Sequence, residues 1–576
     1  MRKILILFNV LIGFTSAFGQ ETIKEDKKQG TFCNPMNLNY RFQSNYREAA
    51  DPAIIRYKDK YLLFASHSGG YWYSDDLMDW KFLAIESLPA IQKYAPGVIT
   101  IKDTVYYVAS SRMKDYIYYT TNPFKDNWKR MDKKLPMDVW DPQFFQDDDN
   151  KVYLYWGCSN LEKEPIRVVE LDKNMQPKTE PVVCIKHNPD EHGWEVFGEK
   201  NESGKNGFNE GAWMTKYKGK YYLQYASNGT QFKTYADGVY TGNSPLGPFK
   251  YENYSPFSYK PGGFIGGAGH SSTFQDKYGN YWHVTSLNIG VRGYFERRLG
   301  LFPASFDKDG VLRTYTAFGD YPLKMPSVKT GIKEENLFTG WMLLSYHKKA
   351  SASSTLSQYP ETNAFDEDVK TYWSASTGNK GEWLSVELDE NVKTINAIQI
   401  NFADNEASLD SNSKNIYNYR VLSSLDGKIW KVVADRNNNT KDACHDYIEL
   451  ENPIKAKYIK IENTNVVPGG GKFSIFDLRI FGIQKGKKPN RVNEFNVKRD
   501  AEDSRKALVK WSNDSSATGF VINYGTESNK LYTSVMVYDQ NYIDLTGLNK
   551  GIPYYFSIDA FNESGITKGT KIITIK

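Results

Sequence analysis

Residues 51–64 read DPAIIRYKDKYLLF, which is a carboxylate, an apolar run, a short Lys-Asp-Lys turn and a second apolar run rich in aromatic residues. Two apolar runs around a polar turn predict a β-hairpin. The same pattern begins again at Ala95, Asp141, Glu210 and His270, and further strand-like segments follow each copy. The copies recur at roughly 45 to 70 residues, close to the length of a four-stranded blade with loop insertions. The repeat therefore predicts an all-β fold that begins with a five-bladed β-propeller.

The residues that open the five copies are expected to meet, because the innermost strand of a propeller blade begins at the central channel. Three of the five are carboxylates, namely Asp51, Asp141 and Glu210. Cleavage of a glycosidic bond uses one carboxylic acid to protonate the leaving oxygen and one carboxylate on the opposite face of the sugar. A third carboxylate can raise the pKa of the acid. The sequence thus predicts one catalytic site, although chemistry alone does not assign the three roles.

The sequence pattern changes near residue 345. From there, alternation of apolar and polar residues with a period of two dominates and predicts a second β domain. Residues 485–490 read KGKKPN and are typical of a linker. The segment that follows contains several short alternating strands, and Tyr554 stands where a tyrosine corner would lie in a small β-sandwich.

Composition narrows the classes of partner. The chain has 576 residues, which is too long for a single hydrophobic core, and its formal net charge is only +5. No block of Lys and Arg predicts a nucleic-acid partner. Aromatic residues make up 15% of the chain, a proportion that suits both strand packing and stacking on sugar rings. The four cysteines form no Cys-x-x-Cys pair, which argues against a zinc or redox motif; we expect buried free thiols and assign no disulfide.

The N-terminus predicts export. A basic start, Met1-Arg2-Lys3, precedes an apolar run from Ile4 to Phe14 and small residues before Gln20. This is the pattern of a cleaved signal peptide at residues 1–19. No cysteine stands at the cleavage point, and no later segment is long and apolar enough to span a bilayer. We therefore expect a periplasmic or secreted protein without a membrane span.

Four of the opening motifs resemble those of the family 43 glycoside hydrolases. Asp51-Pro52, Ala95-Pro96, Asp141-Pro142 and Glu210-Gly211 follow one another in the order found in that family, over residues 30 to 320 or so. The resemblance implies a five-bladed propeller and an inverting hydrolase. It implies that Asp51 is the general base, that Asp141 raises the pKa of the acid and orients it, and that Glu210 is the general acid.

The resemblance also suggests binding residues. His270 lies in Gly269-His270-Ser271, similar to a family segment near the channel that helps to hold calcium or another ion; a hydrogen-bonded structural histidine is the alternative. An arginine late in the propeller often binds substrate in the family, and Arg297 and Arg298 are the candidates. Trp72 and Trp140 are the aromatic candidates for sugar contact. No cofactor is expected for the chemistry itself.

The second β domain resembles the discoidin fold of family 32 carbohydrate-binding modules, through residues 364–368, 371–374 and the closing 477–482. The resemblance implies a structural calcium held by Asp366, Asp368, Thr371 and Asp477. The last segment resembles fibronectin type III, with Trp511, Tyr524, Leu548 and Tyr554 at its core positions. The predicted domains are listed in order as residues 30–335 for the propeller, 345–484 for the discoidin-like domain and 488–576 for the fibronectin type III domain.

These features together predict an exo-acting glycosidase acting on an oligosaccharide or polysaccharide. The family resemblance favours arabinofuranosyl or xylosyl residues of side chains, with β-galactofuranosidase or exo-galactosidase as alternatives. A second class of hypothesis is a non-catalytic glycan-binding protein that uses the propeller and the discoidin-like domain together.

Overall fold

The computed structural model describes residues 30–42, 46–158, 165–204, 207–330, 334–409, 415–512 and 514–576. The predicted signal peptide, 1–19, lies outside these ranges. Every regular element within them is a β-strand or a 3-10 helix of three or four residues, which confirms the all-β prediction. The 3-10 helices are Pro89–Gln92, Gly193–Glu195, Glu334–Leu337, Glu361–Ala364 and Pro468–Gly470. In this described part no helix has the length and apolar character needed to cross a membrane.

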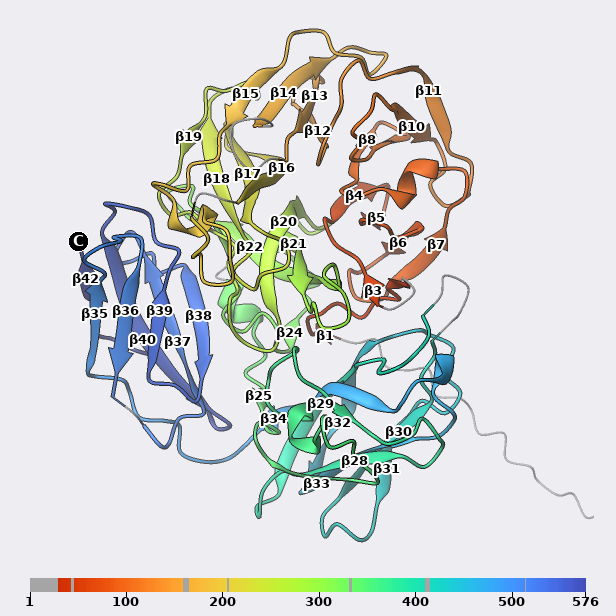
Figure 1. Cartoon of the computed structure of the whole chain (residues 1–576), viewed down its shortest axis with the longest axis vertical. Coiled ribbons are helices and arrows are strands. Elements are labelled where there is room, and N and C mark those ends of the chain that lie inside the picture. Colours follow the sequence, from red (N-terminus) through yellow and green to blue (C-terminus); the bar gives the residue numbers. More distant parts are fainter. Residues whose placement is uncertain are drawn as a thin grey trace, which may run out of the picture.

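The first half of the chain forms five successive four-stranded sheets around a common axis (Figure 1). Each sheet contains four strands that are consecutive in the chain and paired in chain order. The strands are β4 Ala53–Tyr57, β5 Lys60–Phe64, β6 Gly70–Ser74 and β7 Lys81–Ala84; β8 Gly97–Ile101, β9 Thr104–Val108, β10 Tyr116–Thr120 and β11 Lys129–Lys134; β12 Gln143–Gln146, β13 Val152–Trp156, β14 Ile166–Leu171 and β15 Val182–Ile185; β16 Phe208–Tyr217, β17 Lys220–Asn228, β18 Ala236–Gly242 and β19 Lys250–Tyr251; β20 Gly266–Gln275, β21 Tyr281–Asn288, β22 Arg297–Phe306 and β23 Leu312–Thr314.

Each predicted hairpin forms the first strand pair of a sheet. In the first sheet Ala53 pairs with Phe64, so the start of β4 lies beside the end of β5. Lys58 has a φ of 56° at the turn, and Lys102 and Lys218 adopt the same left-handed conformation in later sheets. Since the first two strands are antiparallel, the loop after the second strand returns to the end of the sheet where the first strand began. All five such loops therefore lie on the face where the opening residues stand.

The ring closes between the fifth and first sheets through side-chain packing. Trp282, Leu299 and Leu301 share a buried apolar cluster with Leu63 and Trp72. The N-terminal segment runs alongside, with β1 Thr31–Phe32 paired to β24 Leu323–Lys324 and β2 Arg41–Phe42 paired to β3 Arg47–Glu48. Burial of large aromatic and aliphatic side chains contributes roughly 1.5–3 kcal/mol each, which holds the ring without a strand exchanged between the two sheets.

The second unit is a pair of five-stranded sheets around their own apolar core. One sheet contains β25 Met342–Leu343, β27 Trp373–Ser374, β29 Lys393–Phe402, β32 His445–Ala456 and β34 Ser474–Ile483. The other contains β26 Lys349–Ala352, β28 Trp383–Glu387, β30 Tyr419–Ser424, β31 Lys431–Asp435 and β33 Tyr458–Asn463.

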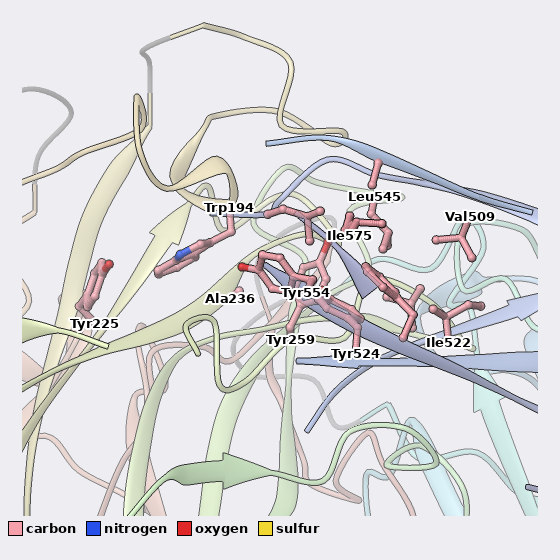
Figure 2. Close-up of a cluster of buried hydrophobic side chains, with 14 of the residues drawn as sticks. Trp194, Tyr225, Ala236, Tyr259, Val509, Ile522, Tyr524, Leu545, Tyr554 and Ile575 are labelled. Atoms are coloured by element: carbon pink, nitrogen blue, oxygen red, sulfur yellow. The ribbon is translucent and has the colours of Figure 1, made fainter. Parts of the chain in front are cut away.

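The last unit also has two sheets. One contains β35 Phe495–Arg499, β36 Ala507–Trp511 and β39 Tyr542–Leu545; the other contains β37 Gly519–Gly525, β38 Thr533–Tyr538, β40 Tyr554–Asn562, β41 Gly565–Thr567 and β42 Ile573–Ile575. The Tyr554 hydroxyl accepts the backbone N–H of Asn549 at 3.0 Å, as expected for a tyrosine corner. Figure 2 shows that the core of this unit continues towards the propeller, where Trp194 of the 3-10 helix Gly193–Glu195 lies between Tyr554 and Tyr225 of the fourth sheet.

Buried ion pairs join the units. Arg47, just before the first propeller sheet, donates to Asp404 at 2.7 Å and to Asp442 at 2.8 Å, both in the second unit. At a second junction Tyr538 of the last unit donates at 3.3 Å to Glu367 of the second unit, whose carboxylate is held within that unit by two hydrogen bonds of 2.6 and 2.9 Å from Arg479. Because breaking a buried pair leaves an uncompensated charge, these contacts favour one arrangement of the three units.

Candidate active site

Each propeller sheet has a residue of unusual backbone conformation just before or within its first strand. The left-handed residues are Asp51, Ala95, Asp141, Gly211 and His270, with φ values of 53°, 44°, 49°, 61° and 49°. Left-handed conformations in residues other than glycine cost free energy and cluster at functional sites. In the first three sheets this residue precedes the first strand, whereas Gly211 and His270 lie within β16 and β20 at register shifts in the pairing with the next strand.

The fourth sheet corrects one detail of the predicted repeat. Its left-handed residue is Gly211, whereas Glu210 comes one position earlier, at a register shift between Glu210 and Trp213 in the pairing with β17. A Cβ on Gly211 would lie 2.7 Å from the His270 ring. Glycine is therefore required there by both backbone and space, and the carboxylate reaches the site from the preceding residue.

Serine hydroxyls at the ends of second strands fix the opening residues. Ser286 accepts the backbone N–H of Asp51 at 2.8 Å. Ser66 accepts the N–H of Ala95 at 2.7 Å and donates to Asp51 Oδ2 at 2.5 Å. Ser110 accepts the N–H of Asp141 at 2.8 Å and donates to its Oδ1 at 3.0 Å. Each serine ends one sheet's second strand and holds the first residue of the next sheet. The prediction missed them, although a serine after a small residue recurs at this place in the sequence.

Cys158 occupies the same place in the third sheet. Its thiol donates to Glu210 Oε2 at 3.1 Å, while the Tyr235 hydroxyl donates to Oε1. Burial raises the pKa of the Cys158 thiol well above its ordinary value, and the charges of Asp141 and Glu210 raise it further, so the sulfur keeps its proton. All four cysteines are free, as predicted, but Cys158 and Cys184 are only half-buried.

Asp51 is held in its ionised form. Burial raises the pKa of Asp51, but Arg297, His270 and the Ser66 hydroxyl together outweigh that effect, and the net pKa lies below its ordinary value. Arg297 Nη1 lies 3.2 Å from Asp51 Oδ1, and its Nη2 lies 2.6 Å from Glu48. Arg297 is therefore the predicted arginine that the structure brings to the site.

Asp141 has the opposite setting. Burial raises the pKa of Asp141 to about 7, and although His270 lowers it, the charges of Glu210 and Asp51 raise it. One ligand atom from each of Asp141, Cys158 and Glu210 lies within 4.8 Å of the others. Repulsion between neighbouring carboxylates in a space of low polarity favours retention of a proton.

His270 lies between the two aspartates, with Nδ1 3.3 Å from Asp51 Oδ1 and 3.8 Å from Asp141 Oδ2. Burial lowers the pKa of His270, but the carboxylates of Asp51, Asp141 and Glu210 raise it above its ordinary value overall. The geometry makes His270 a counter-ion for the acids. An imidazole among carboxylate oxygens also fits an oxygen-rich cation site, and calcium binding here stays a prediction.

Two of the predicted substrate residues lie elsewhere. Arg298 is fully buried, and its guanidinium donates to His445 at 2.8 Å and to the backbone oxygen of Arg47 at 2.8 Å. Trp72 is fully buried in the apolar core, and its indole N–H donates to Asn39. Substrate binding by either residue is therefore a wrong prediction. Trp140, next to Asp141, is half-buried with its ring 4.8 Å from the Arg112 guanidinium, and it remains a candidate.

The predicted calcium residues of the second unit are neighbours. Thr371 donates to Asp366 at 2.7 Å, and the backbone N–H of Asp368 donates to the same carboxylate at 3.1 Å. Asp477 accepts the backbone N–H of Glu367 at 3.0 Å. Oxygen donors of this kind fit calcium. Burial raises the pKa of Asp477 well above its ordinary value, so its ionised form would need a cation nearby.

A propeller axis that carries an ionised carboxylate, Asp51, and a carboxyl with a raised pKa, Asp141, next to a third acid, Glu210, has the groups that a glycosidase uses. Residues 46–312 match the family model described as Glycosyl hydrolases family 43, and residues 349–477 match the F5/8 type C domain. Residues 46–312 thus form a domain similar to those of glycosyl hydrolase family 43, residues 349–477 form a discoidin-like domain similar to the F5/8 type C domain, and the protein is a glycosidase.

Three relatives are similar to part of this chain. A "Beta-xylosidase" of Xylanibacter ruminicola is 25% identical over 269 residues, which are 38% of this chain and 82% of the relative. A "Xylosidase/arabinosidase 43A" of Humicola insolens is 29% identical over 270 residues, 40% of this chain and 78% of the relative. A "Beta-D-galactofuranosidase" of Aspergillus niger is 30% identical over 186 residues, 30% of this chain and 47% of the relative.

Replacement of Asp141 by Asn is expected to stabilise the protein more as pH rises. The folded-state pKa of Asp141 is about 7, above its ordinary value of 3.8, so its contribution to stability is complete below pH 3.8 and is lost as pH rises through 7. The difference in melting temperature between Asp141→Asn and wild type should therefore grow from pH 4.5 to 8 in scanning calorimetry.

Asp147→Asn is the matched control for this pH series. Burial raises the pKa of Asp147, but hydrogen bonds from Lys216 and Tyr221 lower it below its ordinary value. Its stabilising contribution is present above pH 3.8 and is lost only as pH falls below that value. Asp147→Asn should thus lower the melting temperature by a constant amount from pH 5 to 8. A constant difference for Asp141→Asn as well would contradict the assignment.

Gly211→Ala is expected to lower kcat/KM by at least about tenfold, because the new methyl group would displace the His270 ring. Gly219→Ala is the matched control: Gly219 also has a positive φ, of 81°, but its Cβ would meet nothing within 4 Å. Backbone strain is common to both variants, so equal losses of activity in initial-rate measurements would show that the contact with His270 has no part in catalysis.

Proposed function

We propose that the protein is an inverting, exo-acting glycosidase that removes arabinofuranosyl or xylosyl residues from polysaccharide side chains. The observation that carries the mechanism is the contrast between Asp51, held ionised by Arg297 and His270, and Asp141, which keeps a proton up to about pH 7 beside Glu210. Pairs of acids whose environments push their pKa values apart are the mark of separate acid and base roles.

In the proposed reaction Asp51 accepts a proton from a water molecule as its oxygen attacks the anomeric carbon. Glu210 donates a proton to the glycosidic oxygen, and the bond between that oxygen and the anomeric carbon breaks through an oxocarbenium-like transition state. The water oxygen becomes the new anomeric hydroxyl on the opposite face of the ring. Asp141 holds a proton close to Glu210, and the hydroxyl of Tyr235 and the thiol of Cys158 fix the orientation of the Glu210 carboxylate.

The activities for which the relatives are named support the choice of sugar, since two of the three are xylosidases or arabinosidases. The galactofuranosidase relative supports β-galactofuranosidase activity as an alternative. Exo-galactosidase activity is an alternative that rests on the sequence resemblance. The loops around the site differ between sheets, and we expect them to determine which of these sugars binds.

We further infer that the last unit is a fibronectin type III domain. Sheets of three and five strands and the tyrosine corner at Tyr554 support this. We keep 30–335, 345–484 and 488–576 as the proposed domain limits, while β25, Met342–Leu343, pairs with β34 of the second unit and so lies just before the second of them. Export to the periplasm or medium is a proposal that rests on the signal-peptide pattern of the N-terminus. Calcium at His270, and calcium held by Asp366, Asp368, Thr371 and Asp477, are proposals that rest on family resemblance.

A panel of nitrophenyl glycosides tests the activity. Wild type should release nitrophenol from α-L-arabinofuranoside or β-D-xyloside, with β-D-galactofuranoside and β-D-galactoside as the alternatives. Glu210→Gln should lower kcat by about 10²–10⁴ on an oligosaccharide with a poor leaving group and by less on the nitrophenyl glycoside, which needs little protonation. Asp51→Asn should impair both. Glu180→Gln, at an exposed glutamate, is the control. A wild type inert on every sugar, with glycan binding intact, would favour the non-catalytic hypothesis.

The stereochemical outcome is a separate test. Because Asp51 is assigned to activate water rather than to form a covalent intermediate, the first-formed sugar should have the anomeric configuration opposite to that of the substrate. Proton NMR of the reaction within the first minutes reads this directly, before mutarotation mixes the anomers. A first-formed product of retained configuration would assign Asp51 as a nucleophile instead.

A further inference from the structure

The loop between β21 and β22, residues 289–296, joins two parts of the site. β21 ends beside the start of β20, the strand that carries His270, since Gly266 pairs with Asn288. β22 begins at Arg297, whose guanidinium binds Asp51 at 3.2 Å. This segment is called the 289–296 loop below. Its position places it on the face of the propeller where the catalytic carboxylates lie.

The 289–296 loop presents aromatic rings next to the proposed base. The Phe295 ring lies 4.8 Å from the Arg297 guanidinium and 5.8 Å from the Tyr94 ring. Tyr294 packs edge-on against Phe295 at 4.9 Å, yet 59% of Tyr294 is exposed. Burial raises the pKa of Tyr294, and so does the charge of Glu210, which places this phenol within electrostatic reach of the proposed acid. An exposed ring at this place is suited to the apolar face of a sugar.

The loop is closed on itself by Glu296. The backbone oxygen of Glu296 accepts the N–H groups of Ile289 and Gly290 at 2.9 and 3.1 Å. Its carboxylate accepts those of Val291 and Arg292 at 3.0 and 2.7 Å. These four hydrogen bonds to Glu296 give the loop a defined shape.

The F5/8 type C domain makes hydrogen bonds to the 289–296 loop and to Asn288 from outside the propeller. Arg292 donates to the backbone oxygens of Asp404 and Ala407, the latter at 3.0 Å. Lys370 donates to Asn288 Oδ1 at 2.7 Å and to the backbone oxygen of Ile289. The Asp404 carboxylate is itself fixed by Arg47 at 2.7 Å. The contacts run from a buried ion pair between domains to the loop that carries Tyr294.

We propose that the 289–296 loop is a substrate-binding element in which Tyr294 stacks on the sugar, and that the F5/8 type C domain positions it through Arg292 and Lys370. This domain is then part of the wall of the active site, whatever glycan it binds by itself. The inference rests on the proposed glycosidase function. It adds Tyr294 as a specificity-determining residue, and it gives the F5/8 type C domain a structural role, which is to position the 289–296 loop.

A double-mutant cycle tests the proposal in the full-length protein. Tyr294→Ala should raise KM about tenfold with kcat changed by less than about threefold, because a stacking contact worth about 1.4 kcal/mol corresponds to a factor of ten. Arg292→Ala should raise KM about threefold or more. In the Tyr294→Ala background, Arg292→Ala should add less than about twofold, since it acts through the ring that is already absent.

Two further variants separate positioning from general damage. Tyr294→Phe should recover most of the KM lost in Tyr294→Ala, because the ring and not the hydroxyl makes the contact. Arg420→Ala removes an exposed ion pair with Asp435 in the same domain and should leave KM unchanged. If Arg292→Ala does not fold, Lys370→Ala replaces it in the cycle, with circular dichroism as the measure of folding.

Binding without turnover distinguishes this inference from the proposed function. Calorimetric titration of xylo- and arabino-oligosaccharides into Glu210→Gln, with and without Tyr294→Ala, reports the stacking contact even if catalysis is absent. An inactive wild type whose glycan binding still depends on Tyr294 would overturn the enzymatic proposal alone. Unchanged KM and affinity in Tyr294→Ala, or fully additive effects of Arg292→Ala and Tyr294→Ala, would overturn the loop inference.

Discussion

Repulsion among three carboxylates in a buried space is the constraint on which this structure depends. Asp51, Asp141 and Glu210 meet at the propeller axis, where burial by itself raises the pKa of Asp51 and of Asp141. The protein does not neutralise them evenly. Arg297 and His270 stabilise one charge, at Asp51, whereas Asp141 and Glu210 face hydroxyl and thiol donors. The resulting asymmetry provides an ionised base and a retained proton in one site, and the scaffold has to hold both against their mutual repulsion.

The scaffold does so by repetition. Every propeller sheet has a left-handed residue just before or within its first strand, and three serine hydroxyls bind the N–H groups of Asp51, Ala95 and Asp141 from the sheet before. A hydroxyl that accepts a backbone N–H and also donates to a carboxylate links the position of the sheets to the charge at the axis. The two attached units extend this scheme outward, since buried ion pairs and a shared apolar core leave them little freedom relative to the propeller.

Much of the fold could be predicted because hairpin periodicity is local. A segment such as residues 51–64 contains both apolar runs and the polar turn between them, so the strands and their repeat can be predicted from the sequence. The candidate site was partly legible for the same reason, as Asp51 and Asp141 open their copies of the repeat. Trp72 and Arg298 were misplaced because adjacent residues of a strand face opposite sides, and sequence alone does not say which side faces the channel. Glu210 was taken as the opening residue of the fourth copy, although Gly211 holds the equivalent position, because the sequence does not reveal the register shift between Glu210 and Trp213.

The sequence by itself determined which acids this protein brings to its axis and that β-sheets carry them, because both follow from residue type and local period. Tertiary structure alone decided how the acids differ. The lowered pKa of Asp51 comes from Arg297, 246 residues away in the chain, and the raised pKa of Asp141 comes from burial and from Glu210. The hold of the F5/8 type C domain on the 289–296 loop is likewise made by Arg292 with Asp404 and Ala407. Electrostatic interactions and contacts between distant segments form only when the chain folds, and for this reason no local sequence pattern predicts them.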